Sequence, residues 1–295
     1  MTTVDHAGTN PAIPGLAAVG HRPWRTFFTR PVTLVYLGVL LALTLFCFVG
    51  PFFGRNPIAT DAPVMLPPST EFPAGTNSLG QDMLARMMVG GQASLLVGLW
   101  VAVLSMVLAV GIGAIAGFFG GLADTLLTKI TEFFQVVPAL VLALVAVAIV
   151  GTGLPLIIAV LSLTMWPPTA RIMRAECMRL ASAGYVESAR AAGFSTSRIL
   201  WSDVIPNAMA PVIVSTTMTV GRAILAESAL AFLGLGDPSR PSWGTLLYEA
   251  QSYLQFAWWL TVFPGAAIFI TVLAANMLGD ALNDSLNPTI GKVKQ

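Results

Sequence analysis

The 295-residue chain is 56% hydrophobic and only 10% charged, with a formal net charge of +1 and a mean hydropathy of +0.79. Soluble domains usually contain about 45–50% apolar and about 25% charged residues, so this composition excludes an ordinary soluble globule and predicts that lipid solvates part of the surface. The near-neutral balance gives no basic excess of the kind that nucleic-acid binding requires.

Residues 1–31 form a polar segment that holds both histidines, three arginines and four prolines but no apolar run. A secretory signal would carry a short apolar core followed by a small-residue cleavage site, and neither pattern is present. We therefore expect a flexible cytoplasmic tail here, and a retained membrane anchor in the first apolar run that follows it.

Runs of about 20 apolar residues predict an all-α membrane protein with six transmembrane helices. The third and fourth runs are separated only by GTGLP (151–155), whose glycines and proline are strong local breakers. One span across both runs would exceed the bilayer, so they are kept as two. The six helices are expected at 32–54, 94–120, 133–151, 155–173, 210–235 and 257–280.

Lysine and arginine residues set the predicted orientation. With the N-terminus inside, eleven of the 15 basic residues fall on the cytoplasmic side and one, Arg222, within a span. Cytoplasmic loops carry an excess of these residues. Both termini, including a C-terminal tail at 281–295, and the segment 171–209 are therefore predicted to face the cytoplasm. The two cysteines, Cys47 and Cys177, predict no disulfide framework.

The segment between the fourth and fifth predicted spans carries its own helix signals. Ser182 is expected to cap a helix over 182–192, and Gly193 supplies the left-handed residue that commonly closes a helix. Ser195 or Thr196 is expected to cap a second helix that runs through Val204, which Pro206 should end. Two short helices with a glycine elbow predict a stiff projection, although spacing alone gives an ordinary solvated loop equal weight.

A family resemblance favours the stiff projection. Glu187-Ser188-Ala189, three residues, Gly193 and then Pro206 follow a known spacing. This segment resembles the EAA loop of the membrane subunits of bacterial ATP-binding-cassette importers.

Two further stretches resemble one branch of that family, the second permease subunit of dipeptide, oligopeptide and nickel importers. The first is GTNSLGQDMLARMMVGGQASLLVGL (75–99). The second is AESALAFLGLGDPSRPSWGTLLYEAQSYL (226–254), continued by FPGAAIFITVLAANMLGDALNDSLNP (263–288). Together with the EAA-like loop, the resemblance covers roughly residues 32 to 288.

Four positions depart from the family pattern. Ser188 replaces the middle alanine of the loop motif, and Asp203 stands where the pattern is apolar. Asn77 and Gln81 stand where relatives usually carry aspartate and arginine. These differences concern partner contacts and the outer loop rather than the architecture.

The resemblance implies a type I importer permease fold, with a six-helix domain at 32–280 in the bacterial plasma (inner) membrane and a coupling loop at 176–207. It implies four partners besides lipid: a second homologous permease, two cytoplasmic ATPase subunits and an extracytoplasmic substrate-binding protein. ATP and magnesium would be bound by the ATPase subunits, and this chain would need no cofactor or metal. Peptides are the first expected substrate, and nickel is the nearest alternative.

The resemblance also implies how the loop works. In the family, such loops form coupling helices seated in a groove of an ATPase subunit, and closure of the ATPase pair on ATP moves them as rigid bodies. Glu187 and Ala189 would belong to the docking face, Gly193 would make the bend, and Arg190 and Arg198 would donate ion pairs. The expected coupling residues are Tyr185, Glu187, Ala189, Arg190, Gly193, Arg198 and Pro206.

No motif in the chain predicts enzymatic chemistry. A nucleotide-binding G-x-x-x-x-G-K-[ST] loop is missing, because the one Gly-Lys pair at 291–292 is followed by valine. Both histidines lie in the N-terminal tail, and neither H-E-x-x-H nor G-x-S-x-G occurs, so zinc peptidase and serine hydrolase chemistry are unsupported. We expect no catalytic site, with ATP hydrolysed by partners.

The fifth predicted span carries polar residues at helical spacing. Four positions spaced four, three and four apart form one stripe: Ser215, Thr219, Arg222 and Ala226. A charge at mid-span costs on the order of 2.5–3.5 kcal/mol, so Arg222 and the nearby Glu227 should face the bundle interior or a water-filled route. A translocation-path lining at Ser215, Thr219, Arg222 and Glu227 and a structural contact with neighbouring spans or a partner both stay open.

Glycines in the second predicted span predict close helix packing, since Gly113, Gly117 and Gly121 recur every four residues. Two other classes of function stay open. A stand-alone secondary transporter would need inverted repeats and coupling acids, and Glu227 is the one carboxylate deep in a predicted span. A membrane scaffold or receptor is the other.

Overall fold

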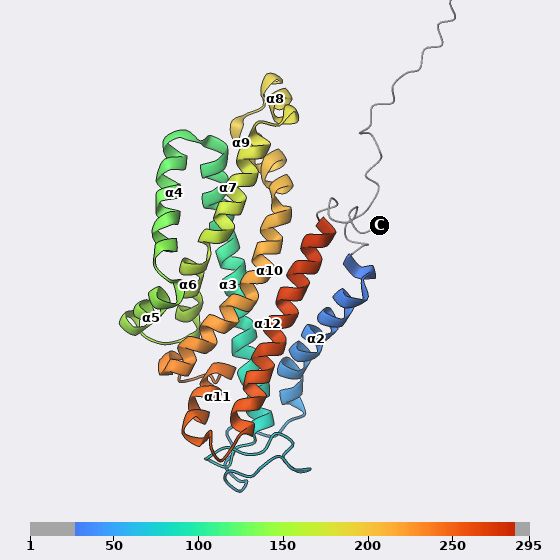
Figure 1. Cartoon of the computed structure of the whole chain (residues 1–295), viewed down its shortest axis with the longest axis vertical. Helices are drawn as coiled ribbons and strands as arrows, with labels where there is room; N and C mark the ends of the chain where they lie inside the picture. The colour runs from blue at the N-terminus through green and yellow to red at the C-terminus, as the bar shows by residue number, and fades with distance from the viewer. Residues whose placement is uncertain (1–26, 287–295) are drawn as a thin grey trace, which may run out of the picture.

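The sequence forms helices wherever its apolar and amphipathic runs occur, and the regular elements of the described part of the chain are helical (Figure 1). The structure is a computed structural model that describes residues 27–286. The all-α prediction is confirmed for these residues. The predicted tails fall mainly on residues 1–26 and 287–295, which lie outside the described part.

In chain order the elements are α2 (Pro31–Phe48), η1 (Gly50–Phe52), α3 (Met83–Phe119), α4 (Gly121–Val136), α5 (Ala139–Val150), α6 (Leu154–Met165), α7 (Pro167–Ala181), α8 (Gly184–Ala191), α9 (Thr196–Arg198), η2 (Ile199–Val204), α10 (Ile205–Leu230), η3 (Ala231–Leu235), α11 (Trp243–Ala250), η4 (Gln251–Tyr253) and α12 (Trp259–Leu286).

Four continuous helical stretches of the described residues are long and apolar enough to cross a bilayer: Pro31–Phe52, Met83–Phe119, Thr196–Leu235 and Trp259–Leu286. Two bent pairs raise the number to six if each pair is one span. The bend is 84° between α4 and α5 and 44° between α6 and α7. The chain is therefore a multi-pass membrane protein.

Several element bounds differ from the sequence-based expectation. Helix α3 begins at Met83, where Asp82 caps it by accepting from the amides of Leu84 and Ala85. Helix α4 occupies residues that were expected to form a connection, and α7 runs on to Ala181. Helices α4 and α7 are amphipathic, and a scan for uniformly apolar runs misses helices of that kind.

The second helix of the hairpin does not end at Pro206, which corrects the expected boundary. Residues 199–204 form a π-helical turn in which the Ile205 amide donates to the Leu200 carbonyl. Proline has no amide to donate, and this wider turn shifts the hydrogen-bond register just before it. The helix therefore continues through α10 to Leu235.

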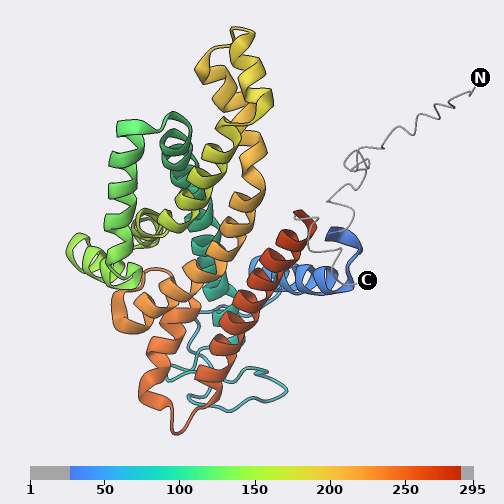
Figure 2. The ribbon, with the colours of Figure 1, turned by 45° about the horizontal axis from the view of Figure 1, so that its top comes forward.

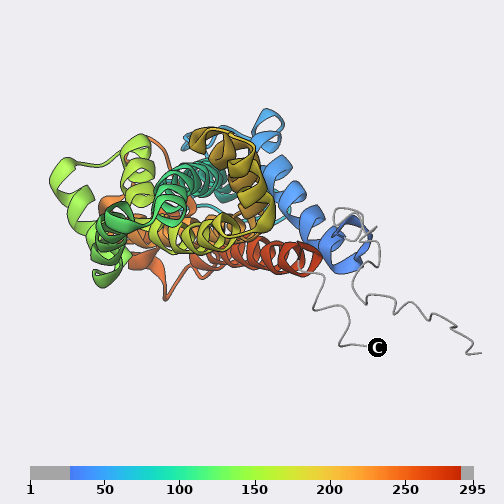
Figure 3. The same cartoon turned by 90° about the horizontal axis from the view of Figure 1, so that it is seen from above.

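Helix α3 runs through the middle of the bundle, with α4 and α5 on one side and α2 on the other (Figure 3).

Glycines of α3 allow a close approach of α7. A side-chain carbon added at Gly113 would lie 2.5 Å from the Ala170 carbonyl oxygen of α7, and one at Gly117 would meet the Arg174 carbonyl. The predicted close packing is therefore confirmed at these two positions. It is wrong for Gly121, which begins α4 with a positive φ of 56° and has open space around it.

The two ends of the bundle differ in character. The hairpin around α8 projects from one end (Figures 1 and 2). Toward that end, an ion pair of 2.9 Å between Arg30 and Asp284 joins the start of α2 to the end of α12. The loop that precedes α3 and the short helix α11 lie at the opposite end.

Candidate functional site

The hairpin formed by α8, α9 and η2 shares a hydrophobic core with the helices that carry it. Val186 of α8 is fully buried, as are Ile199 and Val204 of η2, and they cluster with Cys177 and Leu180 of α7. Burying such side chains stabilises their arrangement by about 1.5–3 kcal/mol each. The hairpin is therefore packed against the helices that carry it and does not hang from them as a loose connection.

Gly193 closes α8 in the way that its sequence position predicts. Its φ is +80°, its amide donates to the Arg190 carbonyl at 3.0 Å, and the Phe194 amide donates to the Ala189 carbonyl at 3.1 Å. These paired hydrogen bonds form the Schellman motif, which uses glycine because other L-residues disfavour the left-handed conformation. The elbow is thus a fixed turn.

The caps of the hairpin helices agree with the sequence at one end only. Ser195 caps α9 and accepts from the Arg198 amide. Ser182 does not cap α8, because it follows α7 and its hydroxyl donates to the Arg179 carbonyl at 3.1 Å. Helix α8 begins instead at Gly184 without a side-chain cap, since α7 continues further than the apolar pattern indicated.

The outer surface of the hairpin presents both expected residues and two that the sequence did not single out. Glu187 is exposed, and both arginines lie over aromatic rings of the same chain: Arg190 at 5.6 Å from the Phe118 ring and Arg198 at 4.4 Å from the Phe194 ring. Trp201 has 64% of its surface exposed and Phe194 has 44%. Exposed aromatic residues in a polar segment are a signal for a protein contact.

The remaining expected residues of the hairpin have structural contacts. The Tyr185 hydroxyl donates to the Asp203 carbonyl at 3.4 Å, although its ring is largely exposed. Ala189 is half-buried against the hairpin core. Pro206 lies in the first turn of α10, where proline is tolerated. Together the seven expected residues lie within one compact unit.

The polar stripe of α10 divides into buried and exposed members. The Ser215 hydroxyl lies 2.8 Å from that of Thr169 in α7, and Thr219 is 1% exposed. Arg222 is exposed, and its Nη2 donates to Thr219 Oγ1 at 2.7 Å. Helical spacing identified a common face but could not show how much of that face a neighbouring helix covers.

Glu227 lies on another side of α10 and is 2% exposed. Its carboxylate accepts hydrogen bonds from Ser94 of α3 at 3.2 Å and from Ser228 at 3.4 Å. The Ser94 hydroxyl in turn accepts from the Trp243 amide at the start of α11. Glu227 therefore joins α3, α10 and α11, which favours the structural interpretation of this residue over the path lining.

Replacing Glu227 should test whether its hydrogen bonds hold α3, α10 and α11 together. We expect Glu227→Gln to keep the purified protein folded, because an amide still bonds to the serine hydroxyls. Glu227→Leu should lower stability by about 1–3 kcal/mol, because it leaves buried hydroxyls without a partner. Thermal unfolding in detergent measures both variants. Equal stability of the leucine and glutamine variants would contradict this structural role of Glu227.

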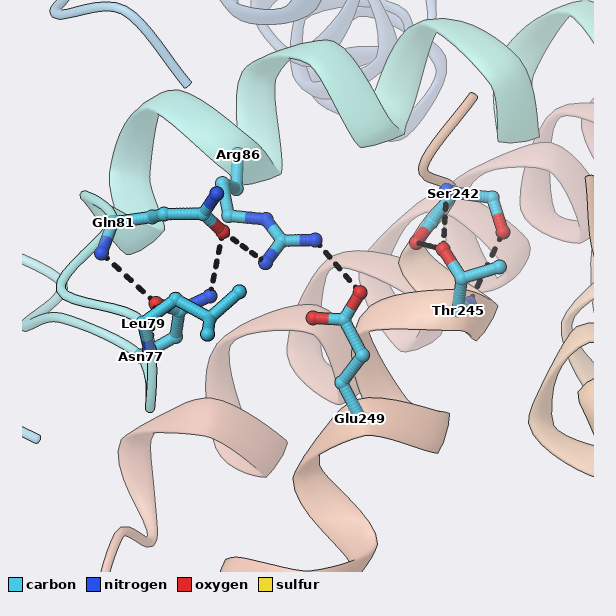
Figure 4. A network of polar contacts seen from close by, with 7 residues as sticks. All are labelled: Asn77, Leu79, Gln81, Arg86, Ser242, Thr245 and Glu249. Carbon is cyan, nitrogen blue, oxygen red and sulfur yellow. Dashed lines mark hydrogen bonds and ion pairs between the residues drawn. The ribbon is translucent and has the colours of Figure 1, made fainter. Parts of the chain in front are cut away.

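A polar network fixes the opposite end of the bundle (Figure 4). The Asn77 amide donates to Gln81 Oε1 at 2.8 Å, and Arg86 Nη1 donates to the same oxygen at 2.6 Å. Arg86 Nη2 continues the network to Glu249 of α11 at 2.8 Å. Two of the four positions that depart from the expected family pattern, Asn77 and Gln81, are thus bonded to each other.

The loop between η3 and α11 is tied to the start of α6. Asp237 accepts from the Leu154 amide at 2.8 Å and from the Ser239 hydroxyl at 2.6 Å. Partial burial alone would raise the pKa of the Asp237 carboxyl, but the hydrogen bonds from Ser239 and from the backbone hold that pKa below its ordinary value. A cavity of about 570 Å³ opens between this loop and the Arg86 network.

Comparisons with known proteins agree with the helical architecture. A sequence model of the family described as "Binding-protein-dependent transport system inner membrane component" matches residues 109–292. A chain of the structure titled "Inward facing conformations of the MetNI methionine ABC transporter" superposes with a TM-score of 0.57 at 19% identity, covering 70% of this chain and 98% of that one. That likeness concerns the fold alone.

Three relatives illustrate the sequence similarity. The di/tripeptide transport system permease protein DppC of Pseudomonas aeruginosa is 38% identical over 234 residues, 77% of each chain. A putative peptide transport system permease protein of Brucella suis is 38% identical over 269 residues, 90% of each chain. The oligopeptide transport system permease protein OppC of Bacillus subtilis is 34% identical over 269 residues, covering 90% of this chain and 88% of that one.

Proposed function

Because the chain belongs to the family of binding-protein-dependent transport system inner membrane components, we propose that it is the peptide-conducting permease subunit of an ATP-binding-cassette importer. The proposal of peptides as substrate is supported by relatives whose names refer to di/tripeptide, peptide and oligopeptide transport. In this assembly a second permease completes the path, two ATPase subunits bind ATP and magnesium, and an external binding protein delivers the peptide. This chain has no catalytic role of its own.

The observation that carries the proposal is the rigid hairpin with two exposed aromatic residues, Phe194 and Trp201, which together are called the hairpin tip. A projection whose buried residues pack in one core with α7 and α10 transmits a displacement that a flexible loop would absorb. Glu187, Arg190 and Arg198 offer charged groups around Phe194 and Trp201, which suits a docking surface with an aromatic centre and a polar rim. ATP-driven closure of the partner subunits would move this hairpin and, through α7 and α10, the spans.

We assign the hairpin end of the bundle to the cytoplasm. The excess of basic residues on that side supports the assignment, and so does the position of the α2 and α12 ends near the hairpin. The Arg86 network and the cavity beside it then face outward, where an external binding protein docks.

The exposed face of α10 is our candidate for the translocation path. Arg222 is the member of the predicted stripe that reaches this face, while Ser215 and Thr219 support it from behind. A charge in a span is expected to face a water-filled cavity or a partner and not lipid. The face is therefore proposed as the wall that this subunit contributes to a path shared with the second permease.

Substitution at the hairpin tip tests the docking role. Trp201→Asp should weaken the association with the ATPase subunits roughly 30-fold or more, because buried tryptophans at protein contacts are worth about 2 kcal/mol or more. The measurement is co-purification of the tagged chain with its ATPase subunits in mild detergent, together with peptide-stimulated ATP hydrolysis. Tyr248→Asp, at an exposed tyrosine on the opposite end, is the matched control for this association and should retain the ATPase subunits.

Full co-purification and stimulated hydrolysis in the Trp201 variant would reject the hairpin tip as the docking surface. Uptake of peptide by this chain alone in vesicles, without ATP, would reject the importer and favour a secondary transporter.

A further inference from the structure

Arg222 has an unusual position for a charged residue of a membrane helix. It lies within α10, well away from both ends of the Thr196–Leu235 stretch, and its side chain is exposed on the surface of the bundle. None of the ion pairs within residues 27–286 involves it. A guanidinium group has five N–H donors, and one of them is used by Thr219. The other four donors are therefore open to water or to an anionic group from outside the described residues.

The neighbouring residues hold this guanidinium in place. The Thr219 hydroxyl donates to the Ser215 carbonyl at 3.0 Å, which leaves its oxygen free to accept from Arg222 at 2.7 Å. Ser215 is itself fixed by its contact with Thr169. The Thr219 hydroxyl thus holds the guanidinium against α10, at a place where Ser215 joins α10 to α7, and orients the remaining donors of Arg222. Such preorganisation lowers the entropy cost of binding a ligand.

The surroundings favour a carboxylate as the partner. Leu225 is exposed on the same face of α10, and no ion pair within residues 27–286 neutralises Arg222, so its charge is open to an anionic group that passes along this face. Glu227 is not available, because it is buried against α3 and α11 on another side of the helix. Arginine donors match the two oxygens of a carboxylate in a bidentate arrangement.

Resting on the proposed function, we infer that Arg222 is a specificity-determining residue that binds the C-terminal carboxylate of a peptide during its passage. Every peptide with a free C-terminus carries this group, whatever its side chains. A single arginine on this wall can therefore select peptides as a class without selecting among their sequences. The contact is transient, because conduction requires that the substrate also leaves.

The test uses the whole transporter in liposomes with its binding protein saturated by trialanine or by trialanine amide. Arg222→Gln should slow uptake of trialanine at least about tenfold, since a charge-assisted bidentate contact is worth roughly that factor or more. Uptake of the amide should change less than about twofold. Arg222→Lys should restore part of trialanine uptake, and Leu225→Gln, on the same face, should slow both peptides to the same extent. Comparing each variant with wild type for each peptide removes the preference of the binding protein.

Three outcomes would overturn the inference. Equal loss for both peptides in Arg222→Gln would give the residue a structural role. Loss of the second permease from the purified Arg222→Gln complex would show that the guanidinium pairs with a partner subunit. Failure of the wild-type complex to take up either peptide would reject the proposed function itself, a result that differs from a loss confined to the variant.

Discussion

Replacing Gly193 by valine should lower ATP-driven uptake about tenfold or more while the protein still reaches the membrane. The glycine has a φ of +80° and closes α8 through the amides of residues 193 and 194. A residue with a Cβ atom pays about 1–2 kcal/mol in this left-handed conformation, and a β-branched one more. About 1.4 kcal/mol corresponds to a factor of ten in a rate. If the hairpin bends to relieve that strain, movement of the ATPase subunits should no longer reach the spans.

The controls for this prediction lie in the same hairpin. Gly184→Val should retain uptake, because Gly184 has no positive φ and a side chain there meets nothing within 4 Å. Gly193→Asn should lose little, because asparagine adopts the left-handed conformation more readily. Uptake and peptide-stimulated ATP hydrolysis are measured together, since uncoupling reduces the first more than the second. Wild-type uptake in Gly193→Val would show that the elbow is unimportant for coupling.

The hairpin also shows which parts of the fold can be predicted from sequence. Gly193 and Ser195 were identified correctly because their roles depend on hydrogen bonds within a few residues. Ser182 and Pro206 were misjudged because α7 and α10 extend beyond the lengths that local signals suggest. Tertiary packing against the hairpin core stabilises those extra turns, and a local reading does not include that stabilisation.

The polar stripe of α10 shows the corresponding limit for the site. Period 3.6 correctly grouped Ser215, Thr219 and Arg222, and the hydrogen bonds that link them confirm the grouping. Which side of the stripe is open depends on Thr169 in α7, a residue that no pattern in the sequence connects to α10. Glu227 was grouped with the path for its charge, but its partners Ser94 and Trp243 come from distant segments. Contacts between distant segments decide the use of a polar residue and are not encoded locally.

Replacing Gly117 of α3 by alanine should lower the stability of the protein. The new carbon would overlap the carbonyl of Arg174 and lie 3.0 Å from its Cα atom. Those are backbone atoms of α7, so relief requires separating two helices and not merely rotating a side chain. Overpacking of this kind costs about 1–3 kcal/mol and occasionally more. Because α7 leads directly into the hairpin, the same separation should also reduce coupled uptake.

Gly111→Ala is the matched control, because it makes the same chemical change in the same helix where nothing lies within 4 Å. Alanine is favoured over glycine inside a helix by about 0.8–1 kcal/mol, so this variant should unfold at the same or a slightly higher temperature than wild type. The two variants are therefore expected to shift stability in opposite directions, which separates helix packing from helix propensity. Thermal unfolding in detergent provides the comparison. If both variants unfolded at the same temperature, the contact between α3 and α7 would not be close enough to require glycine at residue 117.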